Sequence, residues 1–243
     1  MTDWDGAALG RLRAAVHRRD GAEGVDLLRE RPLDPVLQYA GDVLVAAVRA
    51  QVAGAEPLAR ACLESLTGRG LPGDAELAGD LTAALGLGPA ADLAEVPVDL
   101  GELGSELDAE PEGEMEGEVY VVDLLRGDIL PVGELNGEDT GEVEPAFDEI
   151  DERYDAARWL QFWPERDRAE RDMADFSATV TDERLRARLE EALAGRWPYR
   201  RFLEAIRDTP EDARWLLFRE ERQRGRARAW LASYGYRPAP RTL

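Results

Sequence analysis

An acidic stretch in the middle of the chain separates two segments that have helical periodicity. Residues 74–152 hold 25 Asp and Glu side chains and a single Arg. Within this stretch, residues 101–117 are mostly Gly, Glu and Pro, so few apolar side chains are available to offset the entropy lost on ordering the backbone. We therefore predict a helical bundle over residues 1–88, an acidic linker with room for a short helix over 89–117, a second domain over 118–237 and a tail over 238–243.

The segment before residue 88 has the apolar spacing of short helices. Leu9, Leu12 and Val16 recur at three- and four-residue intervals, which places them on one helix face. Pro35 and Pro57 suit the first turn of a helix, where the missing backbone N–H is not needed. Helices are expected to begin near residues 5, 20, 35, 56 and 74. Their spacing is irregular and shows no repeat, so a small all-α bundle is the simplest arrangement.

The segment after residue 118 combines strands with helices. Residues 119–124 and 129–132 are rich in β-branched and apolar side chains and flank a turn at 126–128, which predicts an antiparallel strand pair. Another strand is expected over residues 158–162, and helices are expected over 182–193, from Pro198, and from 210 to about 234. The predicted fold class is α+β: an N-terminal all-α bundle followed by a small antiparallel sheet packed with C-terminal helices.

The charge of the chain argues against several functions. The 51 acidic and 30 basic residues give a net charge of -21, which repels nucleic acid and anionic lipid on average. Every basic residue is Arg, as a GC-rich genome would favour. The absence of Lys from the sequence excludes a Walker-type phosphate loop, a Schiff base and a Lys general base.

The chain has a single Cys, Cys62, and a single His, His17. They cannot form an intrachain disulfide or a Cys/His zinc site, so the sequence predicts no cofactor and no metal site. A reducing, cytoplasmic location suits such a chain. The longest apolar run, residues 43–48, is far shorter than the roughly 20 residues of a membrane span, so no membrane partner is expected.

Arg and aromatic side chains gather in the C-terminal helices. The candidate contacts for a partner or a phosphate group are Arg196, Trp197, Tyr199, Arg200, Arg201, Arg222 and Arg226. Arg guanidinium groups match phosphate oxygens, and aromatic rings can stack on bases. The alternative is that these Arg side chains pair with local carboxylates, as the four-residue spacing between Arg200 and Glu204 allows. The residues after 152 include 20 Arg and 16 acids, so pairing is the favoured interpretation.

Three segments carry a family resemblance. Residues 122–131 read Val-Asp-Leu-Leu-Arg-Gly-Asp-Ile-Leu-Pro, residues 195–204 read Gly-Arg-Trp-Pro-Tyr-Arg-Arg-Phe-Leu-Glu, and residues 221–231 read Glu-Arg-Gln-Arg-Gly-Arg-Ala-Arg-Ala-Trp-Leu. From about residue 96 to 237 the chain resembles the uncharacterised protein family zero-one-five-eight. It departs from the family pattern at Trp197-Pro198, where relatives have a small flexible pair, and at Leu203, where they have Lys. The resemblance implies no catalytic residue.

Three function classes remain open. A non-catalytic cytoplasmic protein that acts by interaction or regulation is favoured, with an unknown protein partner and an unknown oligomeric state. Nucleic-acid binding through the C-terminal Arg residues is the alternative, and the net charge disfavours it. A carboxylate-based hydrolase comes third, because 51 acidic residues make any chosen pair uninformative. The sequence has no nucleophile elbow, dinucleotide fingerprint or metal-binding helix motif, so no catalytic residue is assigned.

Overall fold

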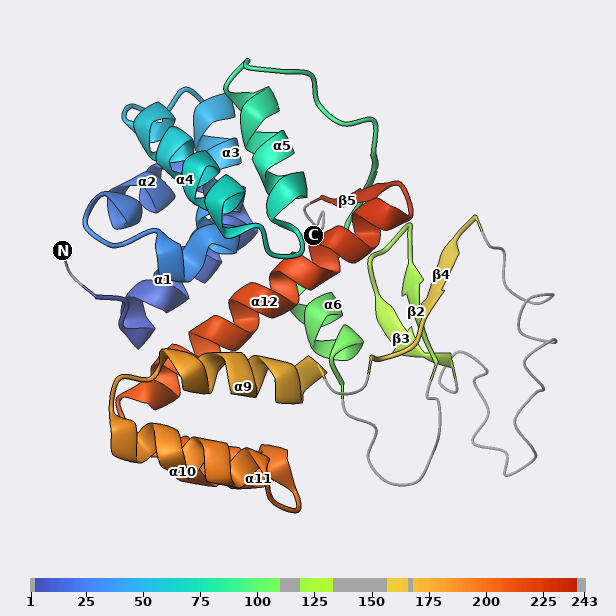
Figure 1. Cartoon of the computed structure of the whole chain (residues 1–243). Coiled ribbons are helices and arrows are strands. Elements are labelled where there is room, and N and C mark those ends of the chain that lie inside the picture. Colours follow the sequence, from blue (N-terminus) through green and yellow to red (C-terminus); the bar gives the residue numbers. More distant parts are fainter. Residues whose placement is uncertain (1–2, 110–118, 133–156, 166–167, 240–243) are drawn as a thin grey trace.

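A computed structural model describes residues 3–109, 119–132, 157–165 and 168–239. It has an α+β fold in which helices predominate, as the sequence predicts (Figure 1). A long helix crosses the molecule, with the N-terminal helices on one side of it and a small sheet near its C-terminal half. Residues 110–117 of the predicted linker and 240–243 of the predicted tail lie outside the described residues. The boundaries of the predicted domains stay a prediction.

The N-terminal bundle forms from helices that begin close to the predicted positions. They are α1 (Gly6–Arg18), α2 (Gly21–Arg29), the 3-10 helix η1 (Asp34–Val36), α3 (Leu37–Arg49), α4 (Ala55–Arg69) and α5 (Asp74–Ala84). The side chains of Asp5 and Asp20 start α1 and α2 by accepting hydrogen bonds from the backbone N–H groups of Ala8 (2.8 Å) and Glu23 (3.1 Å). Leu12 on the predicted apolar face of α1 is fully buried in the bundle core.

The predicted antiparallel sheet is confirmed. It consists of β2 (Tyr120–Asp123), β3 (Ile129–Pro131) and β4 (Trp159–Phe162), in the order β3-β2-β4. Val121 lies opposite Leu130 of β3 and opposite Gln161 of β4. A second, two-stranded sheet was not predicted: β1 (Ala94–Val96) and β5 (Tyr236–Pro238) pair in parallel.

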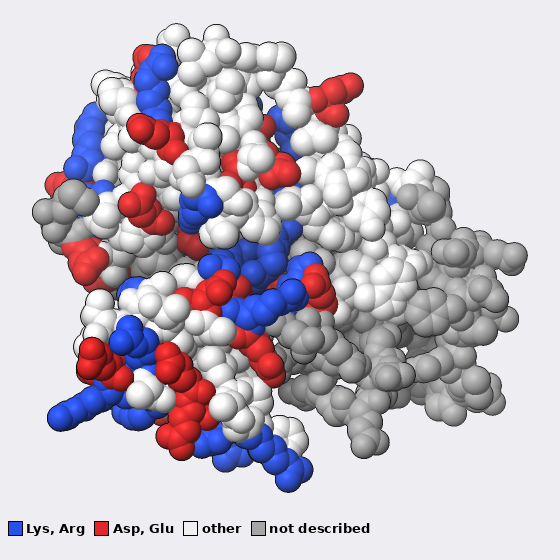
Figure 2. All heavy atoms as spheres, in the orientation of Figure 1, with Lys and Arg blue, Asp and Glu red and all other residues white. Residues whose placement is uncertain are grey.

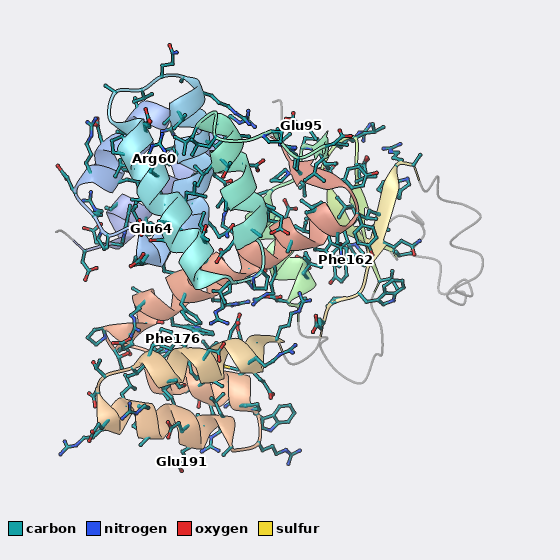
Figure 3. All side chains as sticks on the ribbon, turned by 45° about the horizontal axis from the view of Figure 1, so that its top comes forward. Arg60, Glu64, Glu95, Phe162, Phe176 and Glu191 are labelled. Carbon is teal, nitrogen blue, oxygen red and sulfur yellow. The ribbon has the colours of Figure 1, made fainter. Side chains whose placement is uncertain are left out.

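A helical subdomain with an aromatic core follows the sheet. It contains α9 (Arg168–Thr179), α10 (Glu183–Leu193) and α11 (Pro198–Ile206), of which α9 was not predicted. The ring of Phe176 in α9 lies 6.4 Å from that of Phe202 and 5.3 Å from that of Trp215 on the crossing helix. Figure 3 shows Phe176 pointing into the space between α9 and that helix, whereas Glu191 lies on the outer side of α10. The aromatic core therefore holds the pair α10 and α11 as a fixed hairpin.

The crossing helix α12 (Glu211–Ser233) contributes to each of the three large apolar cores. Trp215 belongs to the aromatic core, Leu217 to the core of the N-terminal bundle, and Leu231 to the core beneath the sheet. Packing of the backbones is close where α12 passes the bundle: a Cβ on Gly73, whose φ is +83°, would lie 2.2 Å from the carbonyl oxygen of Gly225. Only glycine fits this crossing without displacement of α12.

Helix α6 (Leu100–Leu107) lies inside the range predicted as linker. Leu103 and Leu107 are buried against α12, and Asp99 caps the helix by accepting the N–H of Gly101 at 2.7 Å. The prediction left room for a short helix in residues 89–117, and α6 is such a helix, but the expected shortage of apolar groups does not keep residues 101–107 from ordering. The number of apolar residues within the segment does not decide whether it folds, because α6 packs its apolar side chains against α12.

Candidate functional site

Four of the seven candidate contacts lie together where α10 meets α11. Arg196, Trp197, Arg200 and Arg201 are exposed and form what we call the hairpin surface. Trp197 keeps 66% of its surface exposed, and the guanidinium carbon of Arg196 lies 5.3 Å from the centre of its ring. In Figure 2 this end of the hairpin is a basic projection at the lower edge of the molecule. The surface therefore combines an exposed aromatic ring with several cations.

The backbone of the hairpin turn is unusual at Trp197. Trp197 has φ 62° and ψ 57°, the left-handed conformation, immediately before the first-turn proline of α11, Pro198. A bulky side chain costs about 1–2 kcal/mol in this region, so the surrounding structure must hold it there. The side chain of Arg201 packs against the backbone of Gly195. A Cβ at residue 195 would lie 1.8 Å from Nη1 of Arg201, so only glycine leaves room for this contact. The turn thus presents Trp197 outward at the expense of local stability.

The other three candidate contacts are not part of the hairpin surface. Tyr199 is half-buried and its hydroxyl accepts a hydrogen bond from Arg219 (3.1 Å). Arg222 donates to Asp175 at 2.7 Å. Their role as contacts for a partner or a phosphate group stays a prediction, but the side chains of Arg222 and Arg226 are already engaged within the protein.

Arg226 bridges two nearly buried carboxylates from different helices. It donates from Nε to Asp108, which follows α6, at 3.1 Å and from Nη2 to Asp172 of α9 at 2.7 Å. The side chains of both acids are less than 5% exposed. These two ion pairs of Arg226 fix the relative positions of α6, α9 and α12 where the three helices meet.

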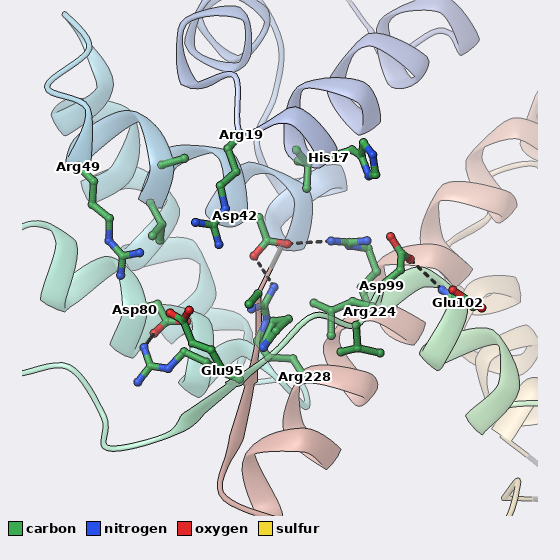
Figure 4. Close-up of a pocket in the computed structure, with 18 of the residues that line it drawn as sticks. His17, Arg19, Asp42, Arg49, Asp80, Glu95, Asp99, Glu102, Arg224 and Arg228 are labelled. Atoms are coloured by element: carbon green, nitrogen blue, oxygen red, sulfur yellow. Dashed lines mark hydrogen bonds and ion pairs between the residues drawn. The ribbon is translucent and has the colours of Figure 1, made fainter. Parts of the chain in front are cut away.

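A cavity of about 650 Å³ lies between the bundle and the C-terminal elements. Its walls come from α1, α3 and α5 on one side and from α6, α12, β1 and β5 on the other (Figure 4). At its floor, Asp42 accepts hydrogen bonds from Arg224 (2.8 Å) and Arg228 (2.6 Å). Beside them, Arg237 donates to Asp80 at 3.0 Å. Sequence reasoning missed this site, although the four-residue spacing of Arg224 and Arg228 on one helix face was visible.

The pKa values of the two carboxylates at the cavity floor are shifted in opposite directions. Burial alone would raise the pKa of Asp42, but Arg228 and Arg224 together hold it below its usual value. Burial raises the pKa of Asp80, against the opposing effect of Arg228 and Arg237. Divergent carboxylate pKa values are typical of acid–base pairs in hydrolases. Here each carboxylate accepts hydrogen bonds from Arg in the free protein.

The single Cys and the single His differ in their surroundings. Cys62 is fully buried, and burial raises the pKa of its thiol to about 12, so the thiolate nucleophile does not form near neutral pH. His17 is exposed and lies on the wall of the cavity. In the part of the chain that the structure describes, no group of three His, Cys, Asp or Glu side chains is arranged to hold a metal ion.

Membrane insertion has no structural counterpart among the described helices. None of them combines the length and the apolar composition needed to cross a bilayer. Even α12, which has 23 residues, carries many Arg and Glu side chains, most of them between residues 219 and 228.

Comparison with known proteins identifies the family. A family model described as "Uncharacterised protein family (UPF0158)" matches residues 103–242. No curated protein and no solved structure matches the chain. The matched residues include the sheet β2 to β4, the hairpin surface and α12. Because the match covers more than half of the 243 residues and agrees with the predicted resemblance, the chain belongs to the uncharacterised protein family UPF0158.

Proposed function

We propose that this protein is a non-catalytic, cytoplasmic interaction or regulatory protein whose hairpin surface binds an acidic region of a partner protein. The observation that carries the proposal is Trp197, which is 66% exposed in a left-handed backbone conformation among Arg side chains. The left-handed backbone conformation lowers the stability of the free protein, and the exposed ring contributes no burial that would offset it. A binding role accounts for both features.

The composition of the hairpin surface suits a protein interface. Trp and Arg are the residue types most enriched among the few that dominate binding energy. Roughly 150 Å² of Trp197 remains to be buried, which corresponds to about 4 kcal/mol of binding free energy before the costs of association. Arg196 and Arg201 form no ion pair with any residue in the described ranges, so both can pair with carboxylates of a partner.

The hairpin is also rigid enough to bind without reordering. Leu189 of α10 and Phe202 and Ile206 of α11 are completely buried in the aromatic core. Only side chains at the turn would lose freedom on binding, which keeps the entropic cost low. A preformed, outward-facing helical turn therefore supports a docking role better than a catalytic one.

Charge distribution favours a protein partner over nucleic acid. Arg200 is 80% exposed, but it pairs with Glu204 at 2.9 Å. Glu190 and Glu191 are exposed on the adjacent helix, and the whole chain carries -21. A phosphate backbone would meet these acids along its length, whereas a compact acidic patch on a protein can contact the Arg cluster alone.

Quantitative affinity capture from the native cell extract tests the proposal. The full-length protein is compared with Trp197→Ala, and with Leu125→Ala as a control that removes an apolar side chain of similar exposure, 71%. Arg201→Glu is compared with Arg184→Glu, an exposed Arg at the opposite end of α10. We expect at least one protein to be recovered by the wild type and both controls and to fall about tenfold with the two hairpin variants.

Two results would contradict the proposal. Recovery of the same proteins by the wild type and by Trp197→Ala would show that the hairpin surface is not a binding site. The second result is that nuclease treatment of the extract abolishes capture of these proteins, while the bait in untreated extract retains RNA. The partner would then be nucleic acid and not a protein. Circular dichroism of each variant checks that the hairpin still folds.

A further inference from the structure

The N-terminal bundle and the C-terminal elements share almost no apolar core. The core of the bundle consists of residues between Trp4 and Leu85, and Leu217 of α12 is the one later residue that joins it among those that the structure describes. The cores beneath the sheet and around Phe176 contain no described residue of the bundle. Beside α12, the cavity of about 650 Å³ separates the two parts (Figure 4). Apolar burial therefore stabilises each part separately and contributes little to their union.

Polar side chains join the bundle to α12 instead. Asp42 of α3 accepts hydrogen bonds from Arg224 (2.8 Å) and Arg228 (2.6 Å), and the side-chain oxygen of Gln38 accepts one from Arg228 at 3.0 Å. Gln38, Arg224 and Arg228 are buried. The desolvation of buried charges offsets much of their mutual attraction, so such contacts add less net stability than apolar packing. Separation of the bundle from α12 should therefore cost less free energy than unfolding of either part.

Glu221 of α12 makes this junction sensitive to pH. Its carboxylate accepts the backbone N–H groups of Gln38 (2.9 and 3.0 Å) and Tyr39 (3.4 Å) in the first turn of α3, where a helix supplies no acceptor of its own. Burial raises the pKa of Glu221 to about 7, against the opposing effect of Arg69 and Arg224. The titratable and charged groups that act on Glu221, share a partner with it or line the same small pocket are Asp42 of α3, Cys62 and Arg69 of α4, Asp74 of α5, and Glu220, Arg222, Arg224 and Arg226 of α12. Ionisation of Glu221 inside the closed junction is therefore unfavourable until the pH exceeds about 7, whereas in the separated state it occurs near the ordinary value of 4.5.

We propose that the bundle separates from α12 as a folded unit when this junction opens, and that a rise in pH through neutrality favours the separation. Opening exposes Glu221 and Arg224 to water and leaves the apolar cores on both sides in place. Residues 85–93 connect α5 to β1 without a helix or strand, and β1 is paired with β5, so movement of the bundle need not disturb either sheet. A carboxyl group with a raised pKa stabilises the closed junction fully below pH 4.5, and this stabilisation is lost as the pH rises through about 7. The inference does not depend on the hairpin surface.

Native-state hydrogen exchange of the full-length protein, followed for each amide by NMR, tests this inference. The amides of Gln38 and Tyr39 report on the junction, because Glu221 protects them. The amide of Ala47, which is fully buried within α3, reports on unfolding of the bundle. At neutral pH we expect opening constants for Gln38 and Tyr39 that exceed the one for Ala47 at least about a hundredfold. Between roughly pH 5.5 and 8, after correction for the intrinsic exchange rate, they should rise about thirtyfold.

Replacement of Asp42 distinguishes opening of the whole junction from a local movement of Glu221. Asp42→Asn leaves Arg224 and Arg228 buried without their carboxylate but removes no contact of Glu221. If the junction opens as one unit, the opening constants of the two reporter amides rise about tenfold or more. Asp26→Asn removes an exposed, ion-paired carboxylate of α2 and should leave these constants within about twofold of the wild type.

Glu221→Gln keeps a hydrogen-bond acceptor but cannot ionise, so it should abolish the pH dependence of both reporter amides. Three results would overturn the inference. Equal opening constants for Gln38 and Ala47 would show that the bundle opens only by unfolding. Unchanged constants in Asp42→Asn would show that Glu221 moves alone. Equal pH dependence in the wild type and Glu221→Gln would show that the charge of Glu221 does not control the separation.

Discussion

Replacement of Glu221 by Gln tests the buried charge that joins α12 to the N-terminal bundle. Glu221 is 5% exposed, and its carboxylate accepts hydrogen bonds from the backbone N–H of Gln38 (2.9 and 3.0 Å) and from Arg69 (3.3 Å). Burial raises the pKa of Glu221 to about 7, although Arg69 and the N–H groups act in the opposite direction. Ionisation of Glu221 near neutral pH therefore carries a free-energy cost.

A raised carboxyl pKa makes stability fall as the pH increases. The ordinary pKa of Glu is 4.5, so between this pH and 7 the folded protein keeps a proton that the unfolded chain has released. The stabilising contribution of Glu221 is complete below pH 4.5 and is lost as the pH rises through about 7. The whole shift corresponds to about 3 kcal/mol, of which about 2 kcal/mol is lost between roughly pH 5.5 and 8.

Urea unfolding of the wild type and of Glu221→Gln over this pH range measures the effect. Gln cannot ionise, and subtraction of the two profiles removes the titration of all other groups. The free energy of unfolding of the wild type, minus that of the variant, should decrease by about 2 kcal/mol between roughly pH 5.5 and 8. Leu217→Ala is the control, because it damages the same junction without removing a titratable group. Parallel profiles for the wild type and Glu221→Gln would refute the reasoning.

Urea unfolding at constant pH checks the remaining predictions. Trp215→Ala empties the centre of the aromatic core and should lower the free energy of unfolding by about 3–5 kcal/mol; a loss below 1 kcal/mol would contradict the proposed packing. Arg226→Met removes the nearest cation from two buried carboxylates, which keep only longer ion pairs with Arg168 (3.7 Å) and Arg222 (3.3 Å), and should cost about 3 kcal/mol, a loss that disappears if both acids are replaced by Asn. Gly73→Ala should destabilise more than Gly70→Ala, because both positions have positive φ but only the first meets the backbone of α12; equal losses would show that the crossing can relax.

Elements whose ends are set by neighbouring residues could be predicted from the sequence. Asp5, Asp20 and Asp182 cap helices at the expected positions. The strands β2 and β3 follow from a short turn in which Gly127 has φ 76°. Four candidate contacts meet at the hairpin surface because they are nearly consecutive in the sequence.

Elements that depend on distant segments could not be predicted. The strands β1 and β5 have three residues each and are separated by most of the chain, so neither shows a pattern of its own. The cavity floor requires Asp42 of α3 to meet Arg224 and Arg228 of α12. Their four-residue spacing shows that the two Arg residues share a face, but which carboxylate they reach is decided by how α12 crosses the bundle.

The position of α12 also sets an order of events during protein synthesis. Leu217 completes the core of the N-terminal bundle, and Glu221 satisfies the first backbone N–H groups of α3. Both residues are synthesised long after α5, the last helix of the bundle, which ends at Ala84. Until then the bundle lacks part of its core and its α3 cap, so the nascent chain exposes an incomplete apolar face that can aggregate.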